Sequence, residues 1–279
     1  MRISASVGIV TAALALSALA VPAAQAEPKP GVSASKTTAF AAASGDESRG
    51  DTKIYGISVG GANNVVVAAT QKKTFTISVT ATDDSGIQDA YAALWHGPDL
   101  RHADGMLLPN LGGGQVGNCT KVTATMSTCE VKIVVDARTD LSNSLAGTWK
   151  VWTAAVANDG DHILREAFST ARVQRSAQLT VDAAPEPVKK GRTLTVTGRL
   201  THASWTDGRS VPYTGQPVKL QFRKKGTDTF ATLKTVTTDR KGNLRTTVRA
   251  TADGDYRYNF FGNSSNPWTT SHLDSIDVR

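Results

Sequence analysis

Two short acidic segments carry the side chains best suited to holding a cation. Asp83 and Asp84 lie in the sequence DDSG, and Asn158, Asp159 and Asp161 lie in NDGD. Calcium takes roughly six to eight oxygen ligands from carboxylates, carbonyls and water. The same residue types also form ordinary turns, because their side chains hydrogen-bond to nearby backbone. The spacing does not follow an EF-hand loop, so a calcium site requires the two segments to meet in space.

A serine motif offers the first candidate for catalysis. Ser58 lies in Gly56-Ile-Ser-Val-Gly60, which matches the GxSxG pattern of a nucleophile elbow. That elbow requires a strand, a sharp turn and a following helix, which together expose the hydroxyl. Here the flanking residues alternate in character as in a strand, and no helical pattern follows. We therefore interpret Ser58 as a strand position.

A loop with two histidines offers a second candidate. His96 and His102 lie with Asp99 and Asp104 in WHGPDLRHADG, and such side chains can bind zinc. The spacing matches no standard zinc pattern, and a surface loop with Trp95 anchoring the core is the simpler interpretation. An enzyme needs a nucleophile, a base and an orienting group in one pocket. The sequence offers no such set, so we expect a non-catalytic protein that requires no cofactor, with calcium as its candidate ligand.

The two cysteines of the chain, Cys119 and Cys129, are close in sequence, in NCTKVTATMSTCE. β-branched and apolar residues surround them, which indicates a hairpin. Cysteines in exported proteins usually pair in the oxidising environment outside the cell. We therefore predict a disulfide between them near the turn of that hairpin, and a metal site is the less favoured alternative because it needs more ligands.

Charge is concentrated in the second half of the sequence. Residues 27–182 hold 14 Lys and Arg against 16 Asp and Glu, whereas residues 183–279 hold 16 against 8. This imbalance favours an anionic partner such as a cell-wall polymer, an acidic glycan or phospholipid head groups, although charge also simply maintains solubility. Nucleic acid is not expected, because no fold motif accompanies the charge. Aromatic and basic side chains in this half give a candidate ligand surface: Trp205, Tyr213, Trp268, Arg223, Lys224 and Lys225.

The first residues predict export. Residues 1–26 combine a basic start, an apolar run and an Ala-Gln-Ala site, which predicts a signal peptide cleaved after Ala26 and a secreted, extracellular chain. No later stretch is apolar enough to span a membrane, so we expect no transmembrane segment in the mature chain. Residues 27–50 are rich in Pro, Ala, Ser and Gly, which predicts a disordered leader.

The rest of the chain predicts an all-β protein of two tandem immunoglobulin-like β-sandwich domains, over 51–182 and 183–279. Short β-branched runs alternate with turn residues, as in KTFTISVTAT over 73–82. Further expected strands include KVTATM at 121–126. The predicted first core contains Phe75, Ile77, Val79, Leu94, Trp149 and Val151. The predicted second core contains Leu194, Val196, Val218, Leu220 and Phe222, with Tyr256, Tyr258 and Phe260.

The segments PEPVKKGRTLTVTGRLT, GQPVKLQFRKKGTDTF and ADGDYRYNFFGN resemble the C-terminal Ig-like module of small exported proteins of Streptomyces and related actinobacteria. TFTISVTATDDSGIQDAYAALWHG and LAGTWKVWTAAVANDGDH are similar to the N-terminal half of the same family. Some members are described as calcium-binding proteins. The resemblance implies export and tandem sandwiches, and it implies no catalytic residues. Two functions follow as alternatives: a calcium-stabilised structural protein, or a cell-envelope binding module acting through the basic second domain.

Overall fold

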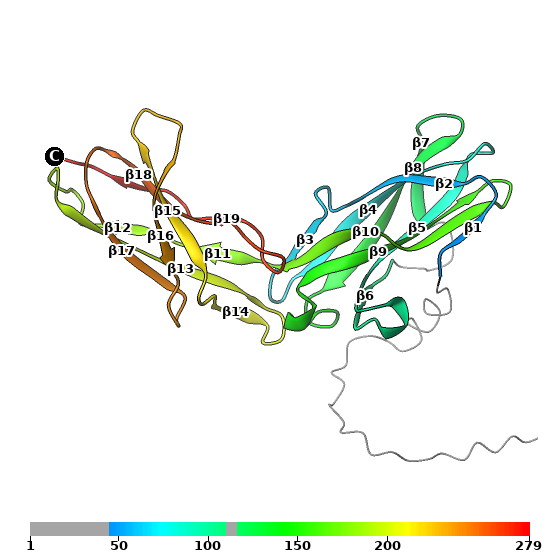
Figure 1. The fold of residues 1–279 in the computed structure, drawn as a ribbon, viewed down its shortest axis with the longest axis horizontal. Coiled ribbons are helices and arrows are strands. Elements are labelled where there is room, and N and C mark those ends of the chain that lie inside the picture. The colour runs from blue at the N-terminus through cyan, green and yellow to red at the C-terminus, as the bar shows by residue number, and fades with distance from the viewer. Residues whose placement is uncertain (1–44, 110–115) are drawn as a thin grey trace, which may run out of the picture. The chain divides into compact units, whose positions relative to one another are not determined.

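The computed structural model describes residues 45–109 and 116–279. The predicted signal peptide and residues 27–44 of the predicted leader lie outside the described residues. Within them, the regular secondary structure is almost entirely β-strand (Figure 1), and the helical segments are single 3-10 turns at Leu100–His102 and Asn143–Leu145. No helix in the described residues is long and apolar enough to cross a membrane. The predicted all-β, Ig-like fold class is confirmed.

The first sandwich consists of two sheets that enclose one core. One sheet has the order β2-β4-β8-β7, from Lys53–Val59, Lys72–Thr82, Met126–Asp136 and Gly117–Lys121. The other has the order β1-β10-β9-β5-β6, from Glu47–Arg49, His162–Arg175, Gly147–Ala157, Ile87–His96 and Gly105–Leu107. Strand β3 (Asn64–Val67) pairs in parallel with β10. This arrangement matches the A-B-E-D and C-F-G sheets of an immunoglobulin domain.

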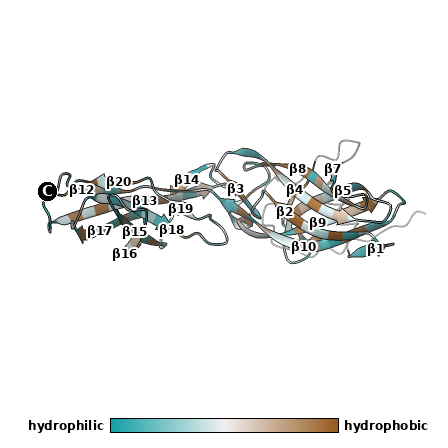
Figure 2. Cartoon of the chain, turned by 90° about the horizontal axis from the view of Figure 1, so that it is seen from above, coloured by the Kyte–Doolittle hydropathy of each residue, from teal (hydrophilic) through white to brown (hydrophobic). Residues whose placement is uncertain are grey.

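Strand alternation explains how each sheet buries one face. In β4, Phe75, Ile77 and Val79 are buried while the intervening Thr and Ser side chains are half-exposed. Figure 2 shows the resulting bands of hydrophobic and hydrophilic residues along the strands. All six residues predicted for the first core are buried. The strands bring together apolar side chains from both sheets.

The second sandwich likewise consists of two facing sheets. In its first sheet, β13 (Thr193–Ser204) pairs with four strands: β11 (Ala177–Leu179), β12 (Asp182–Ala184), β14 (Arg209–Pro212) and β17 (Asn243–Arg249). The facing sheet has the order β16-β15-β18-β19, with β20 also on β18, from Ala231–Thr237, Pro217–Lys224, Gly254–Phe260, Thr269–Thr270 and Asp274–Ile276. The predicted core residues are buried here, except that Phe222 is only partly buried.

Several sequence expectations differ from the structure in detail. Glu47–Arg49, placed in the disordered leader, forms β1 against β10. The expected strand at 121–126 is mostly the turn between β7 and β8, because the pairing of these two strands ends at Lys121 and Ser127. Strand β11 at Ala177–Leu179 lies before the expected boundary at 182 and already pairs with β13. These differences arise where a short strand depends on a distant partner rather than on its own pattern.

Candidate metal centre

The two acidic segments become neighbouring connections of the first sandwich. Residues 83–86 join β4 to β5 and so cross from one sheet to the other, and residues 158–161 form the turn between β9 and β10. Since β5 and β9 are adjacent antiparallel strands, the end of β9 lies beside the start of β5. Ile87 is paired with Ala157, which brings the two segments together.

Hydrogen bonds tie these connections into one unit. The side-chain amide of Asn158 donates to the Ser85 carbonyl over 2.8 Å, and the Asn158 backbone N–H donates to the Gly86 carbonyl over 3.0 Å. The Asp159 N–H donates to the Ser85 hydroxyl over 3.3 Å. Asn158 therefore uses its amide to join the loops, and the aspartates supply the carboxylates.

Five carboxylates gather around this unit. Oxygens of Asp83, Asp84 and Asp159 lie within 4.8 Å of one another. Oxygens of Asp51, Asp83 and Asp161 also lie within 4.8 Å of one another, so Asp83 belongs to both groups. Among residues 45–109 and 116–279, the ion pairs involve none of these five aspartates. The cluster therefore concentrates negative charge without a basic side chain to neutralise it.

Asp51 is the member of the cluster that the sequence reasoning missed. It follows a Gly50 that has a φ of 76°, in the left-handed region where glycine is favoured. A Cβ at position 50 would overlap the Asp161 carboxylate, so only glycine lets Asp161 lie over this turn. The Asp51 N–H donates to Asp161 over 3.2 Å. The Gly-Asp pair directly before the first long strand was the available sequence signal.

Hydrogen bonds and like charges act in opposite directions on two of the carboxyl groups. Asp83 is buried, which by itself raises its pKa, but hydrogen bonds from Thr52 and Ser85 outweigh burial and hold the pKa below its usual value. Partial desolvation, followed by repulsion from Asp84, Asp83 and Asp161, raises the pKa of Asp51. Asp83 is thus held in its ionised form, whereas ionisation of Asp51 is unfavourable because of the neighbouring negative charges.

This chemistry fits a hard cation bound by oxygen. Each carboxylate oxygen has two lone pairs, so an oxygen that already accepts one hydrogen bond retains a site for a metal. Carboxylates from three separate segments, with backbone carbonyls and water, suit the irregular coordination of calcium better than the strict octahedron of magnesium. The structure therefore brings together Asp83, Asp84, Asp159 and Asp161, as the calcium hypothesis requires, and adds Asp51.

The other chemical candidates lie elsewhere. Ser58 lies within β2, as its pattern indicated. His96 bonds to Asp104 over 2.6 Å and His102 to Asp99 over 2.8 Å, so the two histidines form separate His–Asp pairs. The neighbouring Trp95 is buried, but contrary to the sequence prediction it does not join the main core. It packs in a smaller cluster with Leu100, Met106 and Trp152.

The predicted disulfide is confirmed, because Cys119 and Cys129 are bonded. They face each other on the paired strands β7 and β8, as Figure 1 places those strands. The bond therefore closes the hairpin whose turn lies at 122–125. In immunoglobulin domains the disulfide instead joins the two sheets.

The predicted ligand surface is only partly assembled. Trp205 is 3% exposed and packs in the first core, so its assignment to a surface was wrong. Its indole N–H donates to the Val67 carbonyl over 3.1 Å. Tyr213 is half-buried and stacks on His202 with ring centroids 4.0 Å apart.

The remaining four residues of that predicted surface are accessible to different degrees. Trp268 is 62% exposed beside β19. Arg223 is half-buried on β15 and pairs with Asp255. Lys224 and Lys225 are exposed at the end of β15 and in the turn that follows. Arg223 lies on β15 and Trp268 directly precedes β19 of the same sheet, whereas Trp205 and Tyr213 lie elsewhere.

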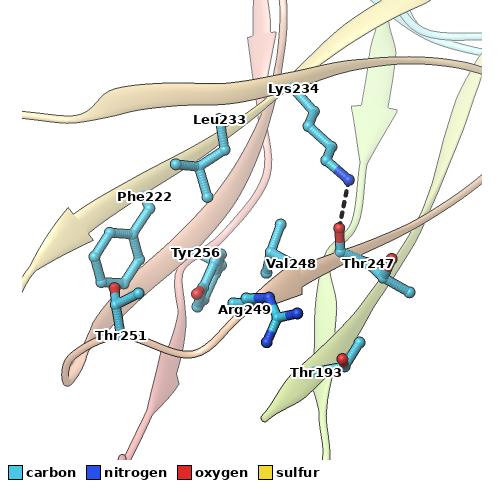
Figure 3. Close-up of a pocket in the computed structure, with 9 residues that line it drawn as sticks. All are labelled: Thr193, Phe222, Leu233, Lys234, Thr247, Val248, Arg249, Thr251 and Tyr256. Atoms are coloured by element: carbon cyan, nitrogen blue, oxygen red, sulfur yellow. Dashed lines mark hydrogen bonds between the residues drawn. The ribbon is translucent and has the colours of Figure 1, made fainter. Parts of the chain in front are cut away.

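A pocket of about 470 Å³ lies between the two sheets of the second sandwich. Figure 3 shows Phe222 and Tyr256 on one side, with Leu233 and Val248 beside them. Lys234 at its edge donates to the Thr247 carbonyl over 2.6 Å. The partial exposure of Phe222 follows from this opening, and the pocket contains no group arranged for catalysis.

No family model and no curated protein matches the sequence. The chain is similar to the three N-terminal domains of the bacteriophage RB49 highly immunogenic outer capsid protein, with 8% identity over 82% of this chain and 71% of that one, and a TM-score of 0.29. It is also similar to the D00-D0 domain of intimin, with 13% identity over 79% and 98% and a TM-score of 0.26. A chimeric titin Z1Z2 is also similar, with 12% identity over 85% of this chain and 99% of that one, and a TM-score of 0.25. The fold assignment rests on the strand order described above, and these values add no functional argument.

Proposed function

We propose that this chain is an exported, non-catalytic structural or binding protein whose first sandwich is stabilised by calcium. The observation that supports the proposal is the meeting of five carboxylates from three connections at one end of that sandwich. The disulfide at Cys119 and Cys129 is compatible with export, which the sequence of residues 1–26 predicts.

Electrostatics explains why a cation would stabilise the fold. Several carboxylates held within 4.8 Å repel one another in the folded state and separate in the unfolded chain. A bound calcium ion cancels this repulsion and links the connections that carry the ligands. Because the ion binds only the folded state, a hundredfold excess over Kd stabilises by about 2.7 kcal/mol. Exported modules bind calcium with Kd on the order of 10⁻⁴–10⁻³ M.

The test is thermal unfolding of residues 27–279 in chelator, calcium or magnesium. Wild type should melt several degrees higher in millimolar calcium, and magnesium should do less. The variant Asp84→Asn with Asp159→Asn should lose the calcium effect. In chelator it should melt above wild type, because two like charges are gone. These two exposed residues are chosen since Asp83 is buried and bonded to Thr52.

The matched control removes two carboxylates elsewhere. Glu130→Gln with Asp228→Asn changes the net charge equally at exposed positions on β8 and in the turn after β15. This control should keep the full response to calcium. Equal responses to calcium and magnesium in all three proteins would mean that only ionic screening acts, and the calcium proposal would be wrong.

A further inference from the structure

One outer face of the second sandwich combines exposed aromatic rings with basic side chains. It belongs to the sheet β16-β15-β18-β19. We define the aromatic–basic face by the five side chains that dominate it: Lys219, Phe230, Arg257, Phe261 and Trp268. None of them belongs to the acidic cluster of the first sandwich.

Strand register places these residues on the same side. Val218 and Leu220 of β15 point into the core. Because strand side chains alternate, Lys219 and Gln221 point outward. The register pairs Lys219 with Asn259 and Gln221 with Arg257 on β18. Asn259 pairs in turn with Thr270 on β19. Phe261 directly follows β18 and Trp268 directly precedes β19. The Trp268 indole lies on the same side as Asn259, to which its N–H donates.

Two of the three aromatic rings are exposed, the Phe230 ring is partly buried, and cations lie beside Phe261 and Phe230. Trp268 is 62% exposed and Phe261 is 57% exposed, which is unusual for side chains of this size. The Lys219 ammonium lies 4.6 Å from the centre of the Phe261 ring, and the Arg257 guanidinium lies 3.6 Å from that of Phe230. Each positively charged group is therefore held next to an apolar ring.

A buried polar layer fixes the geometry of this face. Gln221 and Asn259 point outward, yet they are only 8% and 3% exposed. Gln221 accepts a hydrogen bond from the Arg257 guanidinium over 2.9 Å, and Asn259 accepts one from the Trp268 indole N–H. The Trp268 ring and the Arg257 guanidinium are thus oriented before any ligand arrives, so their ordering on binding would cost little side-chain entropy.

We infer that the aromatic–basic face binds an anionic polysaccharide, whose sugar rings stack on Trp268 and Phe261 and whose acidic groups meet Lys219 and Arg257. The surrounding residues 183–279 carry 16 basic against 8 acidic side chains, which complements such a polymer. From Arg257 to Phe261 the face extends roughly 13 Å along and just beyond β18, which is longer than a single sugar ring and suits a chain of sugars.

The same features fit a nucleic acid less well. Binding to a phosphate backbone needs many cations in series. Here a third cation, Arg223, is neutralised by Asp255 at 2.7 Å. Threonine hydroxyls at 232, 235 and 270 lie among the remaining groups and suit a partner rich in hydroxyls.

The experiment measures binding of residues 27–279 to hyaluronate by titration calorimetry at fixed salt, in chelator so that calcium plays no part. Dextran serves as the neutral polymer and single-stranded oligothymidylate as the nucleic acid. Trp268→Ala and Lys219→Gln should each weaken hyaluronate binding about tenfold. Trp268→Phe should retain most of it, and circular dichroism confirms that each variant is folded.

Matched controls separate this face from net charge and general stickiness. Tyr55→Ala removes an aromatic ring that is 65% exposed in the first sandwich, and Lys241→Gln removes a charge from the turn before β17. Both should bind hyaluronate like wild type. The inference is overturned if wild type does not bind hyaluronate, if Lys241→Gln weakens binding as much as Lys219→Gln, or if dextran or oligothymidylate binds through the same residues as tightly.

Discussion

At the scale of single residues, His202 makes stability depend on pH. Its ring is 8% exposed, stacks on Tyr213 and bonds to Asn266 over 3.4 Å. Burial, and then the positive charge of Arg175, lower the pKa of His202 from 6.5 to about 4. The folded state therefore keeps this histidine neutral at pH values where the unfolded chain protonates it.

The sign of the effect follows from proton linkage. Between pH 6.5 and about 4 the unfolded chain binds the additional proton, so stability contributed by His202 is complete above 6.5 and is lost as pH falls. The loss amounts to roughly 3 kcal/mol at most. Urea unfolding at pH 7 and pH 4.5 should show a smaller decrease in His202→Gln than in wild type. Equal decreases in both proteins would show that other groups carry the acid sensitivity.

Asp51 provides a second test at this scale. Its pKa is raised by desolvation and by the neighbouring Asp84, Asp83 and Asp161, so its ionised form is unfavourable in the folded state. Asp51→Asn should therefore raise the melting temperature at pH 7 in chelator. The gain should shrink as pH falls through the raised pKa, because wild-type Asp51 is then protonated. Asp228→Asn, which removes an exposed charge elsewhere, should show no such gain.

Residue identity allowed the acidic cluster to be predicted but not completed. Asp83, Asp84, Asn158, Asp159 and Asp161 were recognisable because turn residues between alternating strands gather at one end of a sandwich. Asp51 could not be placed, since its position depends on how β1 pairs with β10 far along the chain. The polar residues around Trp205 suggested that it was exposed. This prediction failed because the residues that bury Trp205 lie in the other sandwich.

At the scale of elements, the disulfide should stabilise the hairpin of β7 and β8. Closing a loop with a sequence separation of 10 residues contributes roughly 2–3 kcal/mol in the chain-entropy model. Cys119→Ser with Cys129→Ser should lower the free energy of unfolding in urea by that amount. Dithiothreitol should destabilise wild type similarly and leave the double variant unchanged. If the reductant destabilises both proteins equally, the disulfide is not the cause.

Long alternating strands were predictable, whereas short ones were not. Strand β4 was evident from the alternation of Phe75, Ile77 and Val79 with polar residues, and its partner β8 shows the same period. The segment at 121–126 contains β-branched residues but mostly forms a turn, because Lys121 pairs with Ser127 and the residues between them must reverse the chain. Register between distant strands thus overrides local propensity.

At the scale of the whole molecule, Trp205 links the stability of the two sandwiches. It follows β13 of the second sandwich, yet it packs in the first core and bonds to Val67. Trp205→Ala should cost about 3–5 kcal/mol. Amide hydrogen exchange should show the loss of protection in β3 of the first sandwich, whereas the exposed Trp268→Ala should leave β3 unchanged. Loss confined to the second sandwich would contradict this linkage.

An equilibrium calcium-binding isotherm for residues 27–279 tests directly whether the acidic cluster binds calcium. The two groups of three carboxylates have Asp83 in common, which predicts one ion per chain. The expected Kd is on the order of 10⁻⁴–10⁻³ M. Asp84→Asn with Asp159→Asn should abolish this saturable binding, and Glu130→Gln with Asp228→Asn should retain it. Non-saturating binding in wild type, or an isotherm that the cluster variant leaves unchanged, would contradict a calcium site at this end of the first sandwich.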